Sequence, residues 1–172
     1  MKRKIILAGL VAFSALAFAC ALSACSACTP DNNGGGSEDE IYNGLILRLS
    51  EDETHYLVTG VESNDVTEIT VPADYNNKPV TEIKRAAFYE CGELSTVTIA
   101  DSIEIIEGGA FAYCVSLESV KIPDGVTEIY SDTFRQCAAL KSVIIPESVT
   151  KIYTSAFYNC GITEIILPEG GE

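Results

Sequence analysis

The chain has little positive charge and a single histidine, and both shortages restrict what it does. Lysine and arginine total 11 of its 172 residues against 25 aspartates and glutamates, which gives a formal net charge of −14. No basic cluster carries interleaved aromatic residues, so the sequence predicts neither a nucleic-acid-binding surface nor affinity for anionic lipid. The acidic side chains follow no calcium-loop spacing, so we interpret them as a solvated surface and expect no cofactor.

The shortage of histidine restricts catalysis. His55 is the only histidine, and it lies between Thr54 and Tyr56 in a predicted hairpin. A serine or cysteine nucleophile that needs histidine as its base therefore has one partner, in a poor position. No phosphate-binding glycine motif is present, and nothing singles out two carboxylates as a glycosidase pair. The sequence therefore predicts a protein that is not an enzyme.

Internal repetition is what the chain has in abundance. Phenylalanine and cysteine each recur four times at one fixed spacing in the second half of the sequence. These residues are Phe88, Phe111, Phe134 and Phe157, with Cys91, Cys114, Cys137 and Cys160. A fixed period of this length marks a solenoid, in which coils stack because none of them can bury its apolar face alone.

Each repeat contains two patterns, seen complete in residues 126–146. Near its end, apolar residues alternate at Val143 and Ile145, which is typical of a strand with one buried face, and a proline then ends the strand. A phenylalanine and a cysteine three residues apart, such as Phe157 and Cys160, fit a single helical turn on the far side. The sequence predicts a β-rich solenoid whose coils of about 23 residues each contain a short strand and a helical turn.

The strand core of residues 117–122, L-x-x-V-x-I, preceded by A-F-x-x-C, resembles the repeats of bacterial BspA-like leucine-rich-repeat proteins over about residues 60–168. The resemblance implies right-handed coils, an extracytoplasmic location and, in general, attachment to host proteins, other cells or surfaces. Ala100 stands where later repeats have proline, Thr133 stands where others have alanine, and residues 160–162 are one residue short of the pattern. We expect these departures to change local geometry and to leave the fold intact.

The first 24 residues have the composition of a secretory signal, because a basic Lys-Arg-Lys at residues 2–4 precedes an uncharged apolar run. The segment Leu22-Ser23-Ala24-Cys25 then resembles a bacterial lipobox. This resemblance implies cleavage before Cys25 and a diacylglycerol group on its sulfur, so we predict a lipoprotein signal peptide at 1–24 and a lipid anchor that holds the protein on a membrane. The alternative is an uncleaved anchor, because a run of about 18 apolar residues almost spans a bilayer.

Three further segments follow. Residues 25–40 are small, polar and glycine-rich, which predicts a flexible tether. Residues 41–65 contain two apolar runs, which predict a β-hairpin that caps the N-terminal end of the stack. The leucine-rich-repeat domain covers 66–172 and begins with a degenerate coil. Its C-terminal end has no comparable cap, which leaves three interpretations open: an end protected by Glu169 and Glu172, a self-association surface, or a truncated reading frame.

The equally spaced cysteines raise the question of metal binding and of disulfides. A column at the strand spacing of about 4.8 Å extends roughly 14 Å, too far for four bonds of about 2.3 Å to one zinc ion. Disulfides between neighbours are less clearly excluded, because this pitch lies within the usual Cα separation. We interpret Cys91, Cys114, Cys137 and Cys160 as small buried apolar side chains in a core ladder.

The side chains that point outward from the repeats form the candidate binding patch. The predicted strands contribute Thr98, Lys121, Ile144 and Ile166, and the position after the first isoleucine of each repeat adds Tyr130 and Tyr153. Isoleucine and tyrosine gathered in the last two repeats are typical of an interaction surface. Strand propensity and local packing are the competing explanation.

Together these features predict a lipid-anchored, extracytoplasmic recognition or adhesion module on a bacterial cell surface. Its partner would be an extracellular protein, a glycan or another cell, bound through the repeat surface. The alternative is a structural cell-envelope protein that associates with itself through its uncapped C-terminal edge.

Overall fold

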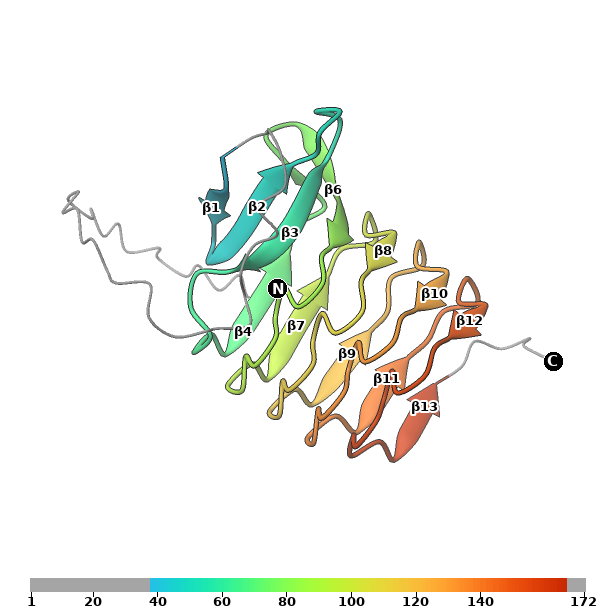
Figure 1. Ribbon diagram of the computed structural model, residues 1–172. Coiled ribbons are helices and arrows are strands. Elements are labelled where there is room, and N and C mark those ends of the chain that lie inside the picture. Colours follow the sequence, from blue (N-terminus) through green and yellow to red (C-terminus); the bar gives the residue numbers. More distant parts are fainter. Residues whose placement is uncertain (1–37, 167–172) are drawn as a thin grey trace, which may run out of the picture.

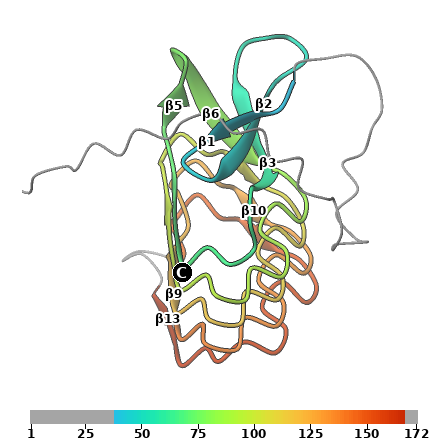
Figure 2. The same ribbon diagram turned by 90° about the vertical axis from the view of Figure 1, so that its left-hand side faces the viewer.

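The computed structural model describes residues 38–166. The predicted signal peptide, the lipidation site Cys25 and most of the tether lie outside the described residues, as do Glu169 and Glu172. In the described part the chain forms a solenoid whose coils lie above one another (Figures 1 and 2). We name each coil by its phenylalanine, so that the Phe134 coil is the one that contains Phe134.

One side of the stack is a five-stranded parallel sheet, to which each coil contributes a strand (Figure 1). Its strands, in spatial order, are β4 (Glu68–Val71), β7 (Thr96–Ile99), β9 (Ser119–Lys121), β11 (Ser142–Ile144) and β13 (Glu164–Ile166). Val120, Val143 and Ile165 are direct neighbours in this sheet although the last step is one residue shorter. The missing residue is absorbed at Gly161, where an added Cβ would collide with the carbonyl oxygen of Ala138. The tightened last coil therefore keeps its strand register.

A second series of shorter strands lies further along each coil. It consists of the end of β6 (Lys78–Ile83), then β8 (Ile105–Ile106), β10 (Glu128–Ile129) and β12 (Lys151–Ile152). Strand β8 pairs with β6 and β10 pairs with β12, both in parallel. The constant length of the repeat thus produces two parallel strand ladders, because every coil follows the path of the coil before it.

The segment expected to form a helical turn is a run of consecutive turns, and residues 38–166 contain no helix. Two positions in each run have left-handed backbone angles, as at Asp132 (φ 60°) and Gln136 (φ 62°), and such residues interrupt a right-handed helix. The N–H of Phe134 consequently donates to the carbonyl of Ala156 in the next coil (2.8 Å), and Phe111 and Phe88 make the equivalent bonds one and two coils earlier. Backbone hydrogen bonds between the turns of successive coils thus form a third ladder, in place of the hydrogen bonds that a helix would make within itself.

The N-terminal part of the described chain is antiparallel. Strands β1 (Glu40–Tyr42), β2 (Leu45–Leu49) and β3 (Tyr56–Val61) pair in order, and β3 then joins β6 in parallel. A small strand, β5 (Asp74–Tyr75), pairs with the start of β6. Leu45, Leu47 and Val58 are fully buried and belong to the same core as the coils. The hairpin lies at the N-terminal end of the stack (Figure 1), and its capping role stays a prediction.

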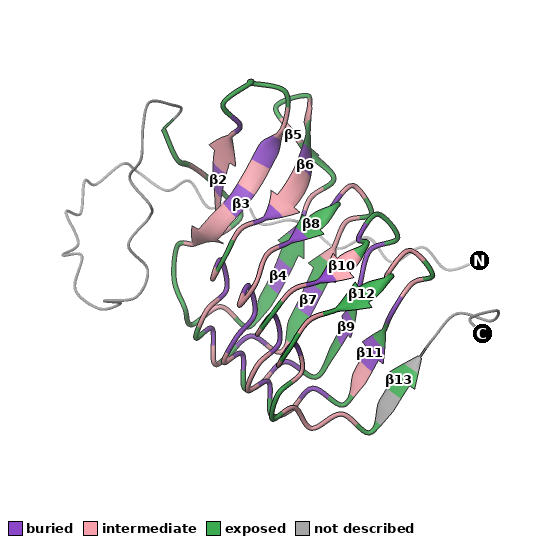
Figure 3. Ribbon diagram, turned by 45° about the vertical axis from the view of Figure 1, so that its right-hand side comes forward, coloured by how far each residue is buried: buried purple, intermediate pink, exposed green. Residues whose placement is uncertain are grey.

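The core runs through the stack as columns of identical side chains. The rings of Phe88, Phe111, Phe134 and Phe157 are stacked with centroid separations of 4.8, 5.4 and 5.4 Å. Burial decreases in the last described coil, whose strands β12 and β13 carry exposed residues (Figure 3). Ile152 is 51% exposed whereas its counterpart Ile129 is 2% exposed, because no coil lies on its far side within the described residues.

Candidate interaction surfaces

The outer face of the five-stranded sheet carries the strand column that the sequence singled out. Thr98, Lys121 and Ile144 are exposed on successive strands, and the pairing of β9 with β11 sets Ile144 directly beside Lys121. Ile166 is the backbone neighbour of Ile144 on β13, although its side chain lies outside the description. Three of the predicted patch residues therefore form one continuous surface.

A second outward column, which the sequence interpretation missed, lies beside the first. Its exposed side chains are mostly hydroxyl-bearing or acidic: Glu68, Thr96 and Ser119. The signal for it was present, because these residues occupy the polar positions two residues before the column of Thr98 and Lys121 and alternate with buried valines. Among the side chains that the structure describes on this sheet face, the surface is polar apart from Ile144, which is 41% exposed.

The two tyrosines of the predicted patch form a separate feature. Tyr130 and Tyr153 follow β10 and β12, so they belong to the other strand series, and both are half-buried. Their rings stack at a centroid separation of 5.4 Å and an interplanar angle of 8°. The Tyr153 hydroxyl donates a hydrogen bond to Glu128, and the Lys151 ammonium lies 4.1 Å from the Tyr153 ring centroid. The structure therefore divides the predicted patch between two sheets.

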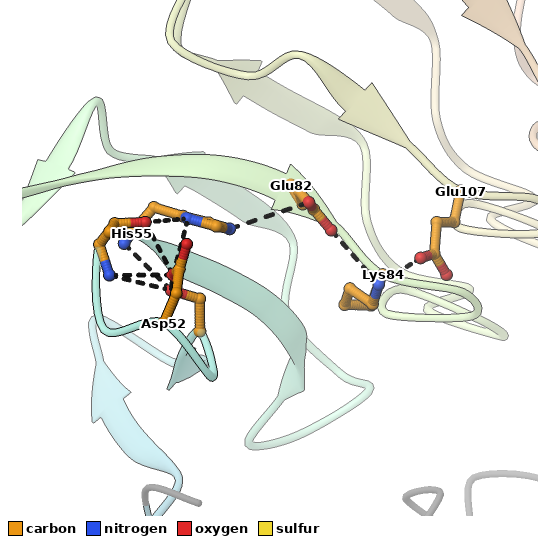
Figure 4. Close-up of polar contacts among 7 residues, drawn as sticks. Asp52, His55, Glu82, Lys84 and Glu107 are labelled. Carbon is orange, nitrogen blue, oxygen red and sulfur yellow. Dashed lines mark hydrogen bonds and ion pairs between the residues drawn. The ribbon is translucent and has the colours of Figure 1, made fainter.

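Earlier in the same column, charges replace the tyrosines (Figure 4). The Lys84 ammonium pairs with Glu82 at 3.3 Å and with Glu107 in the next coil. Burial lowers the pKa of Lys84, but the hydrogen bond and the charge of Glu107 outweigh it, so the pKa is raised overall. Glu82 also lies 3.8 Å from Nε2 of His55, which connects the hairpin to the coils.

The surroundings of His55 do not form a nucleophile and base pair. Its Nδ1 is 2.9 Å from the Thr54 hydroxyl, but that hydroxyl donates its proton to Asp52 at 2.8 Å (Figure 4). A nucleophilic hydroxyl would need to donate to the histidine. His55 lies between the carboxylates of Asp52 and Glu82, each 3.8 Å from a ring nitrogen, as a surface side chain of an acidic loop.

Asp52, in the same loop as His55, is expected to make the stability of the fold depend on pH. Hydrogen bonds from Ser50 and Thr54 lower the pKa of Asp52 from 3.8 to about 2. Because the folded-state pKa is depressed, the ionised carboxylate contributes stability above pH 4, and this contribution is lost as the pH falls from about 4 to about 2. We expect Asp52→Asn to lower the melting temperature at pH 6 and the difference from the unmodified chain to vanish toward pH 2.

Thermal unfolding followed by circular dichroism across this pH range measures the difference. Asp124→Asn is a suitable control, because Asp124 is an exposed aspartate in the turn after β9. A melting-temperature difference for Asp52→Asn that is the same at pH 2 and at pH 6 would contradict the assignment.

The four repeat cysteines form a column through the stack. Cys91, Cys114 and Cys137 are fully buried, Cys160 is half-buried, and none of the four forms a disulfide. Each of the last three thiols donates to the carbonyl of the phenylalanine one coil earlier, at 2.9–3.1 Å. Burial raises the pKa of the Cys114 thiol well above its usual value. A buried, protonated thiol such as that of Cys114 is a poor nucleophile.

The comparisons with known proteins identify the repeat. Residues 62–172 match the family described as BspA type leucine rich repeat region, in six copies. The chain belongs to the BspA-type leucine-rich-repeat family. Members of this family are often associated with the bacterial surface or secreted, and the repeat is typically a non-enzymatic scaffold for protein interaction.

Solved structures agree with this assignment. A leucine-rich repeat protein from Bacteroides capillosus is 26% identical, with a TM-score of 0.66, over 77% of this chain and 99% of that one. One from Bacteroides ovatus is 27% identical with the same TM-score, and this chain spans 38% of its length. A leucine rich cell surface protein from Faecalibacterium prausnitzii is 26% identical, with a TM-score of 0.59, over 76% of this chain and 39% of that one.

A search of curated protein sequences gave no significant match. Within residues 38–166 no helix has the length and apolar character needed to cross a bilayer.

Proposed function

We propose that this protein is a lipid-anchored recognition or adhesion module of the bacterial cell surface, which binds an extracellular protein, a glycan or another cell through the outer face of its five-stranded sheet. The observation that carries this proposal is the position of Ile144, which is 41% exposed beside Lys121 on a regular sheet. The core does not require an isoleucine there, since Thr98 fills the same column in an earlier coil. An exposed apolar side chain with a polar surround is typical of a binding surface.

The proposed location of the protein at the cell surface has separate support. The lipobox-like segment that ends at Cys25 favours a lipid anchor, and family members are often surface-associated. The Faecalibacterium prausnitzii relative carries the description of a cell surface protein. Residues 26–37 would then separate the first strand from the membrane by a glycine-rich tether, which leaves the sheet face accessible to a partner.

The test uses the full chain with Cys25→Ser, which prevents acylation, on an array of extracellular proteins and glycans. We expect a bound partner to lose at least tenfold in affinity with Ile144→Glu, because a charge would be placed in the apolar part of the contact. Ile105→Glu is the matched control, since Ile105 is a comparably exposed isoleucine (37%) on the other strand series. Equal affinities of the Ile144 and Ile105 variants would reject the sheet face as the binding surface.

A second candidate function is self-association, which is favoured by the apolar end of the last described coil. Ile152 and Ile165 are each 51% exposed, whereas Val143, the counterpart of Ile165, is fully buried. At the N-terminal end the equivalent apolar side chains are buried among those of the hairpin. Two copies that meet through this same end would be related by a two-fold axis and would form a closed dimer, not a fibre.

Sedimentation over a wide concentration range tests this second candidate. We expect a monomer–dimer equilibrium that shifts toward dimer as salt is added, because salt screens the repulsion between two acidic chains. Ile152→Glu should abolish the dimer and Ile105→Glu should not. A monomer at every concentration and salt condition would remove self-association from consideration.

A further inference from the structure

The turns opposite the five-stranded sheet bring together a set of side chains that the proposed sheet-face site does not use. Figure 2 shows the turns of successive coils lying above one another along one side of the stack. Within them, Arg135 of the Phe134 coil and Tyr158 of the Phe157 coil are neighbours, with the guanidinium carbon 5.2 Å from the ring centroid. Tyr158 is 55% exposed, so one part of its ring remains open to solvent while the arginine lies over it.

Arg135 is fixed in position by further contacts. Its Nη1 donates to Asp132 at 3.2 Å, and this hydrogen bond is the main reason that the pKa of Arg135 is raised, with Tyr113 of the preceding coil contributing as well. Its Nε is buried and has no hydrogen-bond partner within the described residues. A guanidinium that is bonded to a carboxylate and lies over one ring is preorganised, and it still has donors to offer a ligand.

Two amide residues directly follow Arg135 and Tyr158 in the chain. Nδ2 of Asn159 donates to Oε1 of Gln136 at 2.6 Å, which joins the Phe157 coil to the Phe134 coil. Both residues have left-handed backbone angles, 62° at Gln136 and 54° at Asn159, so the backbone fixes where their side chains leave the turn. This bond uses a single N–H of Asn159 and a single lone pair of Gln136, which leaves both amides with free donors and acceptors for a ligand.

These side chains are of the types that bind carbohydrate. A pyranose ring has a C–H face that stacks on an aromatic ring and a rim of hydroxyls that both donate and accept hydrogen bonds. Tyr158 supplies the ring, Arg135 supplies donors, and Gln136 and Asn159 supply donors and acceptors. Ligand sites generally combine an aromatic surface with a few convergent polar groups of this kind.

We propose that Tyr113, Arg135, Gln136, Tyr158 and Asn159 form a second recognition site, the turn site, whose ligand is a neutral linear glycan lying along the stack. Successive coils are about 4.8 Å apart, so the three coils of the turn site span roughly 10 Å and accommodate about two sugar units. The glycan is neutral because the chain carries a net charge of −14 and would repel an acidic polymer at long range. The proposal rests on the proposed recognition function and names a partner class and a different surface for it.

Isothermal titration of the full chain with Cys25→Ser against four hexasaccharides tests the turn site. Three probes are neutral, namely the β-1,4-linked glucan, xylan and mannan hexamers, and one is acidic, the galacturonan hexamer. We expect at least one neutral probe to bind with a dissociation constant of about 1 mM or below, and the acidic probe not to bind. Tyr158→Ala should weaken binding at least tenfold, whereas Tyr158→Phe, which keeps the ring, should change it by less than about threefold.

The variants separate the turn site from the sheet face. Sugar binding that is lost with Ile144→Glu and retained with Tyr158→Ala would overturn the turn site and support the sheet face. Sugar binding that is lost with Tyr158→Ala and unchanged by Ile144→Glu would establish the turn site independently of the sheet face. Absence of binding to all three neutral probes overturns the proposal, and so does equal binding of the acidic probe. If Tyr158→Ala abolished binding of a protein ligand, the turn site would be a protein-binding site, and the proposal of a glycan ligand would be overturned.

Discussion

Replacing Phe134 with alanine is expected to lower the free energy of unfolding by about 3–5 kcal/mol, the usual range for a buried phenylalanine. Phe134 is fully buried, and its ring lies between those of Phe111 and Phe157 at 5.4 Å on either side. The alanine variant would therefore leave a cavity between two coils and remove both ring contacts. Urea denaturation followed by circular dichroism measures the change.

Phe157→Ala is the matched control for this prediction. Phe157 occupies the same position one coil later, but it is half-buried, and among residues 38–166 its ring stacks on that of Phe134 alone. Its replacement should cost clearly less, because part of its surface is already exposed in the native state. If Phe157→Ala destabilised the chain as much as Phe134→Ala, the two phenylalanines would be equally buried, which contradicts the structure.

The repeat cysteines are expected to differ strongly in reactivity toward a thiol reagent under native conditions. Cys160 is half-buried in the last described coil, and its hydrogen bond with Cys137 lowers its pKa. The same bond and burial raise the pKa of Cys137, which is fully buried. We expect Cys160 to be alkylated at least about a hundred times faster than Cys137, because labelling of a buried thiol requires the coils to open.

Peptide mass spectrometry after timed alkylation at pH 8 measures each cysteine separately, including those of the N-terminal segment. In urea above the unfolding midpoint, the four repeat cysteines should react at similar rates, which provides the internal control. Native labelling of Cys91, Cys114 or Cys137 at the rate of Cys160 would show that the cysteine column is not closed to solvent.

The sequence was sufficient to predict the solenoid, because a fixed period of about 23 residues has one simple physical explanation. It also placed the outward strand positions correctly, since Thr98, Lys121 and Ile144 are exposed and alternate with buried neighbours. The helical turn was a weaker inference. Phenylalanine and cysteine three residues apart fit a helical turn as well as they fit the run of turns in the structure. Left-handed residues such as Asp132 and Gln136 instead direct the backbone N–H groups to the next coil.

Surfaces that depend on contacts between coils were harder to predict. Tyr130 and Tyr153 were grouped with the strand column because they share the last two repeats, yet they belong to the second strand series. The pairing of Arg135 with Tyr158 could not be predicted from the sequence, because the two residues lie one full repeat apart on the turns. Such contacts follow from the coil geometry and not from local sequence.

The one-coil spacing of the hydrogen bonds has a consequence for the history of the gene. Lys141 bonds to Glu118 and Thr150 bonds to Thr127, so each segment depends on the one a single repeat away. An in-frame gain or loss of one whole repeat therefore recreates the same junctions between coils wherever it occurs. Unequal recombination can then lengthen or shorten such a chain without requiring a new core.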